Sequence, residues 1–302
     1  MRWAYDTEQD GQPANFHGDP VLTDALVLVG SDVGGHEETE EAQGYVYAFD
    51  RLDGTVRWKH GVPGGVPSDL VRRGDVLYGV TSAGGLLCLE IATGRVRFSV
   101  DPALGDAGRG LHFSLLSVGD RIVFSGPGGM ITAVDADTGK KLWTRELYNE
   151  VTTTLVAGDG VAYVATELLA VFAIDFATGE IAARLELAGQ AFGTPVLHED
   201  SLLVVLDGGK FQRLGLAKGE VRWTASADQW TSFRPRVVGD HALIGNSEGE
   251  LIAFALADGA RGETHRVEGA VRGFAVVDRM VYVGTLPGRL FAFGSSKTSR
   301  GG

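Results

Sequence analysis

The sequence has almost no cysteine and no long apolar run. Its single cysteine, Cys88, cannot form an intramolecular disulfide, so the fold must be stable without one. Cys88 stands in the strand-like run LLCLEI, where we expect a small core residue, and this is compatible with a reducing compartment. A membrane helix needs about 18 or more consecutive apolar residues, and no such run is present. We therefore expect neither a disulfide-dependent domain nor a membrane-spanning helix.

Positive charge is also scarce. The chain has 27 Lys and Arg against 39 Asp and Glu, which gives a formal net charge of −12. This balance argues against a general binder of nucleic acid or of anionic membranes, because such proteins need an electropositive surface. The first residues, MRWAYDTEQDG, contain no apolar segment of the kind found in signal peptides. We expect a cytoplasmic location, unless a targeting segment lies outside this chain.

Proline is rare as well, whereas glycine is abundant. Nine prolines accompany 44 glycines, so the glycines indicate many tight turns rather than a flexible linker. Many turns imply many short strands. With 44% hydrophobic and 22% charged residues, a chain of 302 residues can bury a large core, in one large domain or two.

One phrase returns along the whole chain. Residues 133–143 read AVDADTGKKLW: alternating β-formers, an Asp that accepts hydrogen bonds from the following turn, a turn glycine, and a tryptophan on the return strand. The copies are marked by turn glycines 40, 45, 40, 40 and 40 residues apart, namely Gly54, Gly94, Gly139, Gly179, Gly219 and Gly259. A period near 40 residues, with four strands in each unit, is typical of β-propeller blades.

The copies predict an all-β fold, a seven-bladed propeller of four-stranded antiparallel blades. The last copy ends at Gly294 without a tryptophan-bearing fourth strand, and the first residues supply one, because MRWAY resembles VRWKH at residues 56–60. We expect the N-terminal strand to complete the last blade and close the ring. The predicted domain is therefore 1–294, and residues 295–302 form a flexible polar tail or linker.

The pattern A-x-D-x-x-T-G-x-x-x-W resembles the tryptophan-docking repeat of the pyrroloquinoline quinone (PQQ)-like β-propellers, and the resemblance covers nearly the whole chain. It implies that the repeat tryptophans fill the seams between blades, a structural role that we assign to Trp3, Trp58, Trp143 and Trp223. The family includes quinoprotein dehydrogenases and BamB-type modules of outer-membrane assembly. The dehydrogenases have eight blades, a vicinal cysteine pair and a bound Ca²⁺. Since this chain has one cysteine and an apparent seven blades, it is nearer to the non-enzymatic BamB-like modules.

The two faces of such a propeller differ in this sequence. The turns within the A–B and C–D hairpins are short and uniform, whereas the longer connections, residues 32–43 and 101–110, join strands B to C and blade to blade. Variable loops on a rigid scaffold commonly carry binding sites. We expect a binding face there. The candidate binding residues, which come from several loops, are Trp230, Phe233, Arg234, Arg272, His17, Asp19, Arg109, His112 and Asp207.

Each group of candidates has a simpler alternative. Trp230 is the one tryptophan out of phase with the repeat, and it either anchors a partner or folds over its own blade. The Arg and His residues either form a cationic mouth for an anionic small molecule or acidic peptide, or pair with carboxylates such as Asp69 and Asp207. Residues 34–41, GGHEETEE, are rich in oxygen donors, and Asp32, His36 and Glu37 are weak metal-ligand candidates. Their spacing matches no EF-hand or zinc motif, which favours a solvated acidic loop.

No catalytic motif is present: the sequence has no CxxC, HExxH, P-loop or GxSxG element. The favoured hypothesis is a monomeric, non-enzymatic scaffold that binds a protein, peptide or polymer on the loops. The alternative, from the family likeness alone, is a PQQ-binding sensor or quinone-dependent dehydrogenase with PQQ and Ca²⁺ at the channel mouth. That likeness also implies a periplasmic or extracellular location. A hydrolase or lyase built on His17 and His112 has only these two histidines in its favour.

Overall fold

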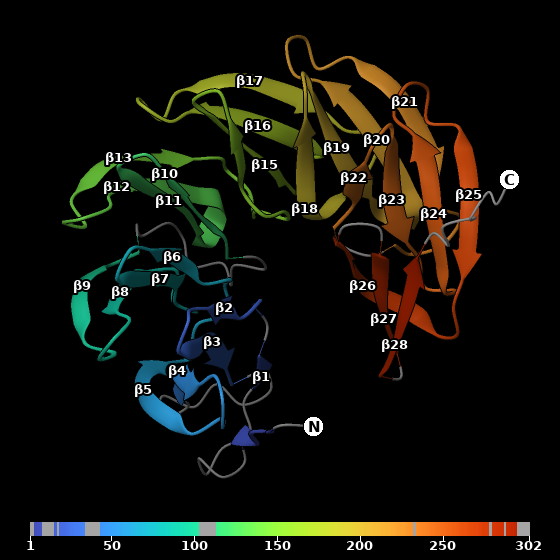
Figure 1. Ribbon diagram of the computed structural model, residues 1–302. Coiled ribbons are helices and arrows are strands. Elements are labelled where there is room, and N and C mark those ends of the chain that lie inside the picture. The colour runs from blue at the N-terminus through green and yellow to red at the C-terminus, as the bar shows by residue number, and fades with distance from the viewer. Residues whose placement is uncertain are drawn as a thin grey trace, which may run out of the picture. The chain divides into compact units, whose positions relative to one another are not determined.

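The computed structural model describes residues 3–7, 15–16, 18–33, 43–102, 113–231, 234–277, 280–286 and 288–294. These residues form strands β1 to β28, together with two short turns of 3-10 helix, η2 (Pro127–Gly129) and η3 (Asp207–Gly209). Figure 1 shows the strands grouped into successive small sheets. The all-β prediction is confirmed.

The strands belong to seven sheets, numbered here in chain order. Sheet 1 contains β1 (Asn15–Phe16), β2 (Val21–Leu22), β3 (Leu26–Asp32), β4 (Gln43–Asp50) and β5 (Val56–Pro63). Sheet 2 contains β6 (Val71–Arg73), β7 (Val76–Val80), β8 (Leu86–Glu90) and β9 (Val96–Val100). Sheet 3 contains β10 (Leu115–Val118), β11 (Arg121–Gly126), β12 (Met130–Asp135) and β13 (Lys141–Glu146).

The remaining sheets follow the same order. Sheet 4 contains β14 (Val156–Gly158), β15 (Val161–Thr166), β16 (Ala170–Asp175) and β17 (Ile181–Glu186). Sheet 5 contains β18 (Ala191–His198), β19 (Ser201–Leu206), β20 (Lys210–Gly215) and β21 (Val221–Ser226). Sheet 6 contains β22 (Arg236–Val238), β23 (His241–Gly245), β24 (Glu250–Ala255) and β25 (Arg261–Arg266), and sheet 7 contains β26 (Ala270–Val277), β27 (Met280–Leu286) and β28 (Arg289–Gly294).

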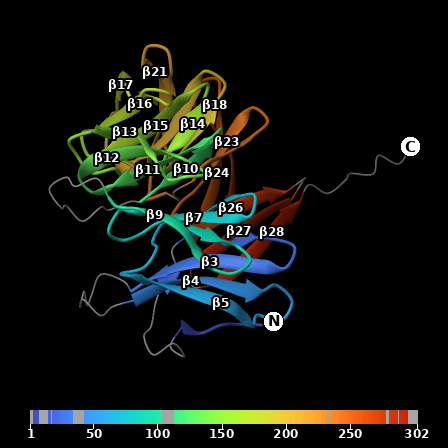
Figure 2. The same cartoon turned by 90° about the vertical axis from the view of Figure 1, so that its left-hand side faces the viewer.

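Each sheet is an antiparallel meander in which strands adjacent in the chain pair with each other. In sheet 1, β3, β4 and β5 run side by side (Figure 2), and Ala48 lies opposite Leu28 on one side and Trp58 on the other. The first strand of this sheet is divided, because β1 and β2 both pair with β3. The predicted four-stranded antiparallel unit is confirmed.

Sheet 7 has three strands among the described residues. The N-terminal residues 3–6 carry no strand assignment, and residues 1 and 2 lie outside the described part of the chain. The predicted closure of a seven-bladed ring by the first strand therefore stays a prediction. The predicted tail, residues 295–302, also lies outside the described residues.

The chain divides into two compact units. Unit 1 comprises Met1–Ala162 and Ile174–Ala182, and unit 2 comprises Tyr163–Ala173 and Ala183–Gly302. Sheet 4 contributes strands to both units. Each unit has its own hydrophobic clusters, for example Leu28 with Leu77 in unit 1 and Phe211 with Phe254 in unit 2.

The tryptophans of the fourth strands dock on the turn glycine of the following sheet. The indole N–H of Trp58 donates a hydrogen bond to the carbonyl of Ile91 at 2.9 Å, Trp143 to Phe176 at 2.9 Å, and Trp223 to Leu256 at 2.8 Å. Trp3 makes the same contact with the carbonyl of Arg51 at 3.2 Å, although it precedes every described strand.

The turn at Gly179 shows why glycine is required there. Its φ of 72° lies in the left-handed region, which side chains with a Cβ rarely adopt. A Cβ at this position would also stand only 2.5 Å from the ring of Trp143. Both the left-handed backbone conformation and the close approach of the indole ring therefore require glycine at this position. The same approach occurs at Gly54, Gly94 and Gly259.

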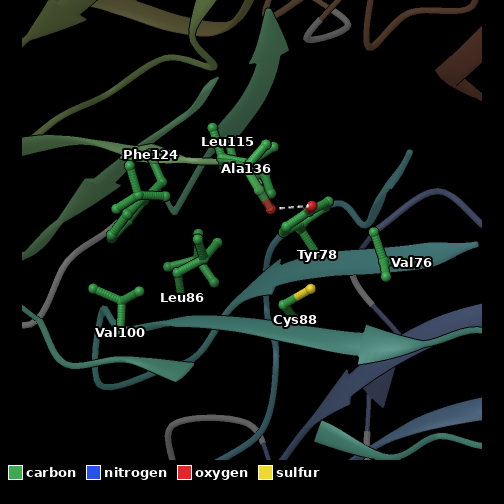
Figure 3. Close-up of a cluster of buried hydrophobic side chains, with 11 residues drawn as sticks. Val76, Tyr78, Leu86, Cys88, Val100, Leu115, Phe124 and Ala136 are labelled. Atoms are coloured by element: carbon green, nitrogen blue, oxygen red, sulfur yellow. Dashed lines mark hydrogen bonds between the residues drawn. The ribbon is translucent and has the colours of Figure 1, made fainter. Parts of the chain in front are cut away.

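Where a phenylalanine takes the docking position, a neighbouring tyrosine supplies the missing donor. The ring of Phe98 lies over Gly139, and the buried hydroxyl of Tyr78 donates to the carbonyl of Ala136 at 2.7 Å (Figure 3). Cys88 is fully buried in the same cluster, and this burial raises the pKa of its thiol to about 11. Cys88 is therefore a protonated core residue at neutral pH, as expected from the sequence.

We predict that Trp143→Ala lowers the free energy of unfolding by about 3 kcal/mol, the usual range for loss of a large packed aromatic side chain. The variant loses the ring contact with Gly179 and the hydrogen bond to Phe176. The matched control is Leu142→Ala, a half-exposed neighbour on β13, which should change stability by about 0.5 kcal/mol or less. Urea denaturation of the full chain measures both values, and equal losses would contradict a docking role for Trp143.

Candidate functional site

Two opposite faces are defined by the connections between strands. The turn face carries the hairpin turns between first and second strands and between third and fourth strands, such as the turn at Gly139. The loop face carries the connections between second and third strands, such as η2, and the links from one sheet to the next, such as residues 147–155. Each unit has its own part of the loop face.

In unit 2 the loop face is joined by backbone hydrogen bonds from one connection to the next. The amide of Ala227 donates to the carbonyl of Gly209 at 2.8 Å, and that of Ser247 donates to Trp230 at 2.8 Å. The carbonyl of Asn246 accepts a hydrogen bond of 2.9 Å from the amide of Val271, which lies near the start of the next sheet. These connections are therefore fixed in position relative to the sheets that carry them.

The same locking occurs in unit 1, and it presents an exposed aromatic side chain. In residues 147–155, the amide of Leu147 donates to Gly129 at 3.0 Å, and the carboxylate of Glu150 accepts from Gly128 at 2.9 Å. Between these anchors, Tyr148 is 78% exposed and has a φ of 60°. This backbone conformation is unfavourable for a bulky residue, so strain and exposure coincide at one tyrosine.

A second exposed apolar element lies in the loop face of unit 2. Leu168 and Leu169 form the turn between β15 and β16, and both side chains are partly exposed. Leu169 has a φ of 54°, whereas the corresponding turns carry glycine at Gly129, Gly209 and Gly249. The sequence analysis missed both Tyr148 and this leucine pair, because a left-handed backbone at a residue other than glycine leaves no mark in the sequence.

The predicted binding residues fall into two groups. Five lie in the described part of the chain and are exposed, namely Asp19, Asp207, Trp230, Arg234 and Arg272, the last of these within β26. His17, Arg109, His112 and Phe233 lie outside the described residues. Of the metal candidates, Asp32 ends β3 and is half-buried, whereas His36 and Glu37 lie outside the described residues. Within the described ranges, no group of three or more His, Cys, Asp or Glu side chains is arranged to hold a metal ion.

Trp230 is 46% exposed, and its carbonyl is held by Ser247. The next residue, Thr231, bridges to Asn246, and the Thr231 hydroxyl is buried without a hydrogen-bond partner. Arg272 follows Val271, which is bonded to the same Asn246. The fold thus connects the segments of Trp230 and Arg272 through Asn246, a fully buried residue whose side-chain amide is hydrogen-bonded within the protein.

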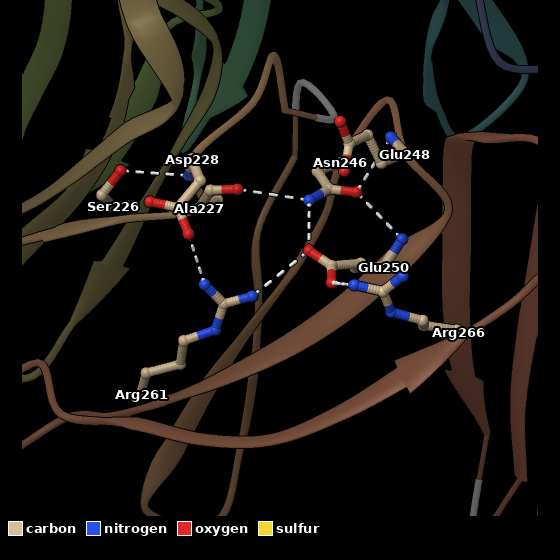
Figure 4. A network of polar contacts seen from close by, with 8 residues as sticks. All are labelled: Ser226, Ala227, Asp228, Asn246, Glu248, Glu250, Arg261 and Arg266. Atoms are coloured by element: carbon tan, nitrogen blue, oxygen red, sulfur yellow. Dashed lines mark hydrogen bonds and ion pairs between the residues drawn. The ribbon is translucent and has the colours of Figure 1, made fainter.

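Asn246 belongs to a buried polar network centred on Glu250 (Figure 4). The Asn246 amide donates to the Glu250 carboxylate at 2.8 Å and to the carbonyl of Ala227 at 3.2 Å. Arg266 reaches the same carboxylate at 2.6 Å and Arg261 at 3.2 Å. The network ties the second, third and fourth strands of sheet 6 to the end of sheet 5.

The network shifts the ionisation of Glu250. The hydrogen bond from Asn246 and the charges of Arg266 and Arg261 lower the pKa of the Glu250 carboxyl below its ordinary value, against the opposing effect of burial. The sequence analysis named none of Glu250, Arg261 and Arg266 as candidates. A lone acidic residue that begins a strand gives no signal that two arginines from the next strand will reach it.

Comparison with known proteins identifies the family. The sequence model described as outer membrane protein assembly factor BamB matches residues 2–156 and 127–300. The chain belongs to this BamB family. The resemblance to PQQ-like propellers of the BamB type, drawn above from the repeat, is thereby confirmed.

The BamB-family relatives are distant and longer. The chain is 27% identical over 168 residues to outer membrane protein assembly factor BamB of Yersinia pestis, covering 50% of this chain and 42% of that protein. It is 28% identical over 144 residues to BamB of Moranella endobia, covering 42% of this chain and 37% of that protein. The chain thus spans less than half the length of these curated relatives.

Solved structures support the propeller fold. BamB from Moraxella catarrhalis superimposes with a TM-score of 0.78 at 18% identity, over 97% of this chain and 88% of that chain. The computationally designed Ika8 protein gives a TM-score of 0.56 at 12% identity, over 93% and 96% of the two chains. These likenesses concern the fold alone. Among the described residues of this BamB-family chain, no helix is long and apolar enough to span a membrane.

We predict that Glu250→Gln destabilises this BamB-family protein by about 1 to 3 kcal/mol at pH 7, because two arginines lose a charged acceptor. The lowered pKa means that the contribution of Glu250 is complete above the ordinary pKa of glutamate and is lost as the pH falls toward the folded-state value. The stability difference between the two proteins should therefore shrink below about pH 4.

Thermal or urea unfolding between pH 3 and 7 measures this difference. Glu263→Gln is the matched control, because Glu263 lies on β25 with an exposed side chain, 3.8 Å from His265. It should leave stability nearly unchanged at every pH. A difference for Glu250→Gln that stays constant as the pH falls would contradict an ionised carboxylate in the network.

Proposed function

We propose that this chain is a non-enzymatic β-propeller scaffold that binds a protein partner on its loop face. The relatives are named outer membrane protein assembly factors, and we assign the same process to this chain, with the periplasmic side of the outer membrane as its location. The observation that carries the proposal is Tyr148, an exposed aromatic side chain on a rigidly anchored, strained loop. Aromatic anchors of this kind dominate the energetics of many protein interfaces.

The residues predicted from the sequence belong to the proposed loop-face parts of the two units separately. In unit 1, Asp19 adds a charged residue; in unit 2, Trp230 supplies an aromatic surface and Arg234, Arg272 and Asp207 supply charges. The chain acts as a monomer and needs no cofactor for binding in this proposal. The leucine pair at residues 168–169 belongs to the same set of exposed loop-face residues.

We further propose that residues 1–294 form one closed, seven-bladed domain, in which the first residues supply the fourth strand of sheet 7. This is supported by Trp3, which occupies on sheet 1 the docking position that Trp58 occupies on sheet 2. A docked tryptophan in this series always belongs to the fourth strand of the preceding sheet. In a ring, the sheet that precedes sheet 1 is sheet 7.

The function is tested by capture of the partner in cells. We predict that Tyr148→Ala abolishes most of the covalent cross-linking between the tagged full-length protein and proteins of the outer-membrane assembly machinery, because the aromatic anchor is lost. The control is Leu52→Ala, an equally exposed apolar residue on the turn face of the same unit. Identical partners and yields from the three proteins, measured by quantitative mass spectrometry, would refute the loop face as the docking surface.

Ring closure is tested by hydrogen exchange. We predict that deletion of residues 1–5 increases the exchange rate of amides in β28 at least tenfold, because these amides lose a pairing strand. Trp3→Ala separates docking from pairing, since it removes the indole but leaves the backbone. If β28 exchanges equally fast in the intact and truncated chains, the first strand does not complete sheet 7.

A further inference from the structure

The charges of unit 1 are divided between its two faces. Lysine and arginine gather on the turn face, for example Arg51, Arg73, Arg95, Arg121 and Lys140. The described loop-face residues of this unit contain no lysine or arginine, but they carry carboxylates at Asp19, Asp32, Asp69, Asp101 and Glu150. The described part of this loop face therefore carries net negative charge, which attracts and orients positively charged partners.

The side chain of Arg145 is engaged on the turn face. Arg145 lies near the end of β13, but its side chain donates to the carbonyl of Gly179 at 2.6 Å, in a hairpin turn of the turn face. The acidic side chains of the loop face instead meet backbone amides: Asp69 accepts from Asp19 at 2.9 Å and Glu150 accepts from Gly128 at 2.9 Å. Both carboxylates are therefore held by backbone amides, and neither forms an ion pair with a lysine or arginine among the described residues.

The carboxylates of the turn face have a different role. Asp135 accepts hydrogen bonds from the amide and hydroxyl of Thr138, and these bonds lower the pKa of its carboxyl. Asp50 pairs with Arg57 at 2.6 Å, and this pairing lowers its pKa as well. These acids are used in building the hairpin turns. Asp69, Asp101 and Glu150 lie outside those turns.

Two features distinguish residues 147–155. The ring of Tyr148 is exposed two residues before Glu150, in a loop held by the hydrogen bonds of Leu147 and Glu150. In the same loop, Thr152 is only 3% exposed, and its hydroxyl has no hydrogen-bond partner. Buried polar groups in native proteins are usually hydrogen-bonded, so an unpaired one requires an explanation.

We propose that the loop face of unit 1 docks a basic protein surface, in which apolar side chains receive Tyr148 and arginine or lysine side chains meet Asp69, Asp101 and Glu150. The phenol ring offers a face to which a guanidinium or ammonium group is attracted, so the aromatic anchor and the acidic rim select the same kind of partner. This inference rests on the proposed function and specifies the chemistry of its partner.

The probe is a fluorescein-labelled dodecapeptide of alternating arginine and leucine, titrated with the full chain. We expect the triple variant Asp69→Asn, Asp101→Asn, Glu150→Gln to weaken binding about tenfold, and Tyr148→Ala about fivefold. The substituted Asn and Gln side chains keep a carbonyl oxygen, which can still accept the hydrogen bonds that the backbone amides of Asp19 and Gly128 donate. Affinity should also fall as the salt concentration rises from 50 to 300 mM.

The control triple variant removes the same net charge from the turn face. It consists of Asp24→Asn, Asp137→Asn and Asp159→Asn, three exposed residues of hairpin turns in unit 1. We expect its affinity to stay within twofold of the parent. Equal weakening by the two triple variants, or no binding of the peptide at 100 µM, overturns the proposal, because only the net charge of the protein would then matter.

The outcome is separable from the cellular test. If Tyr148→Ala abolishes cross-linking in cells while peptide binding ignores the loop-face charges, the loop face remains the docking surface and the basic chemistry of the partner is wrong. If peptide binding depends on those charges while cross-linking in cells does not depend on Tyr148, the acidic surface stands and the proposed function fails.

Discussion

The docking of an aromatic side chain on a turn glycine is the contact on which the repeat depends. At Trp143 the indole lies within van der Waals contact of the Gly179 turn and donates a hydrogen bond to Phe176. One residue thus fills the seam with apolar surface and satisfies a carbonyl at the end of the next sheet. Both effects require the hairpin turn to stay in one conformation, and Asp175 fixes that turn through its bonds to Thr178. The short turn is therefore conserved in form along the chain because it is a packing surface.

This constraint explains why the fold was predictable from the sequence. Asp135, Gly139 and Trp143 each have a local physical role that admits few residue types, so their copies can be counted at intervals near 40 residues. The exceptions follow the same rule. Phe98 lacks an N–H group, and the hydroxyl of Tyr78 takes over the donation to the turn carbonyl. The sequence did not predict that substitution, because Tyr78 precedes Phe98 by 20 residues and meets the carbonyl only through the packing of two sheets.

The loop face was predictable only as a region. Connection lengths identified it, and the binding roles of Trp230 and Arg272, both exposed, stay predictions. The residues that stand out in the structure were hidden for physical reasons. Tyr148 differs from other tyrosines in its backbone angle and exposure, which depend on hydrogen bonds from Gly128 and to Gly129. Glu250 depends on Asn246, four residues earlier, and on arginines that follow it by 11 and 16 residues. Such properties arise from tertiary contacts between loops.

The different structural roles of the turn face and the loop face also account for the distribution of charged residues. Aspartates such as Asp50 are needed to form the hairpin turns, and arginines such as Arg57 lie beside them. Acidic and basic side chains on the turn face therefore partly neutralise each other. The loops are longer and their acids are not needed to shape a hairpin. In unit 1 the described loops have no basic residue that could pair with Asp69 or Glu150. In the free protein, water solvates these carboxylates, so they contribute little to folding stability. A basic partner surface that displaces this water can pair with them, and the pairing does not remove any interaction that the fold needs. The charged residues of the turn face thus build the repeat, and those of the loop face are available for recognition of a partner.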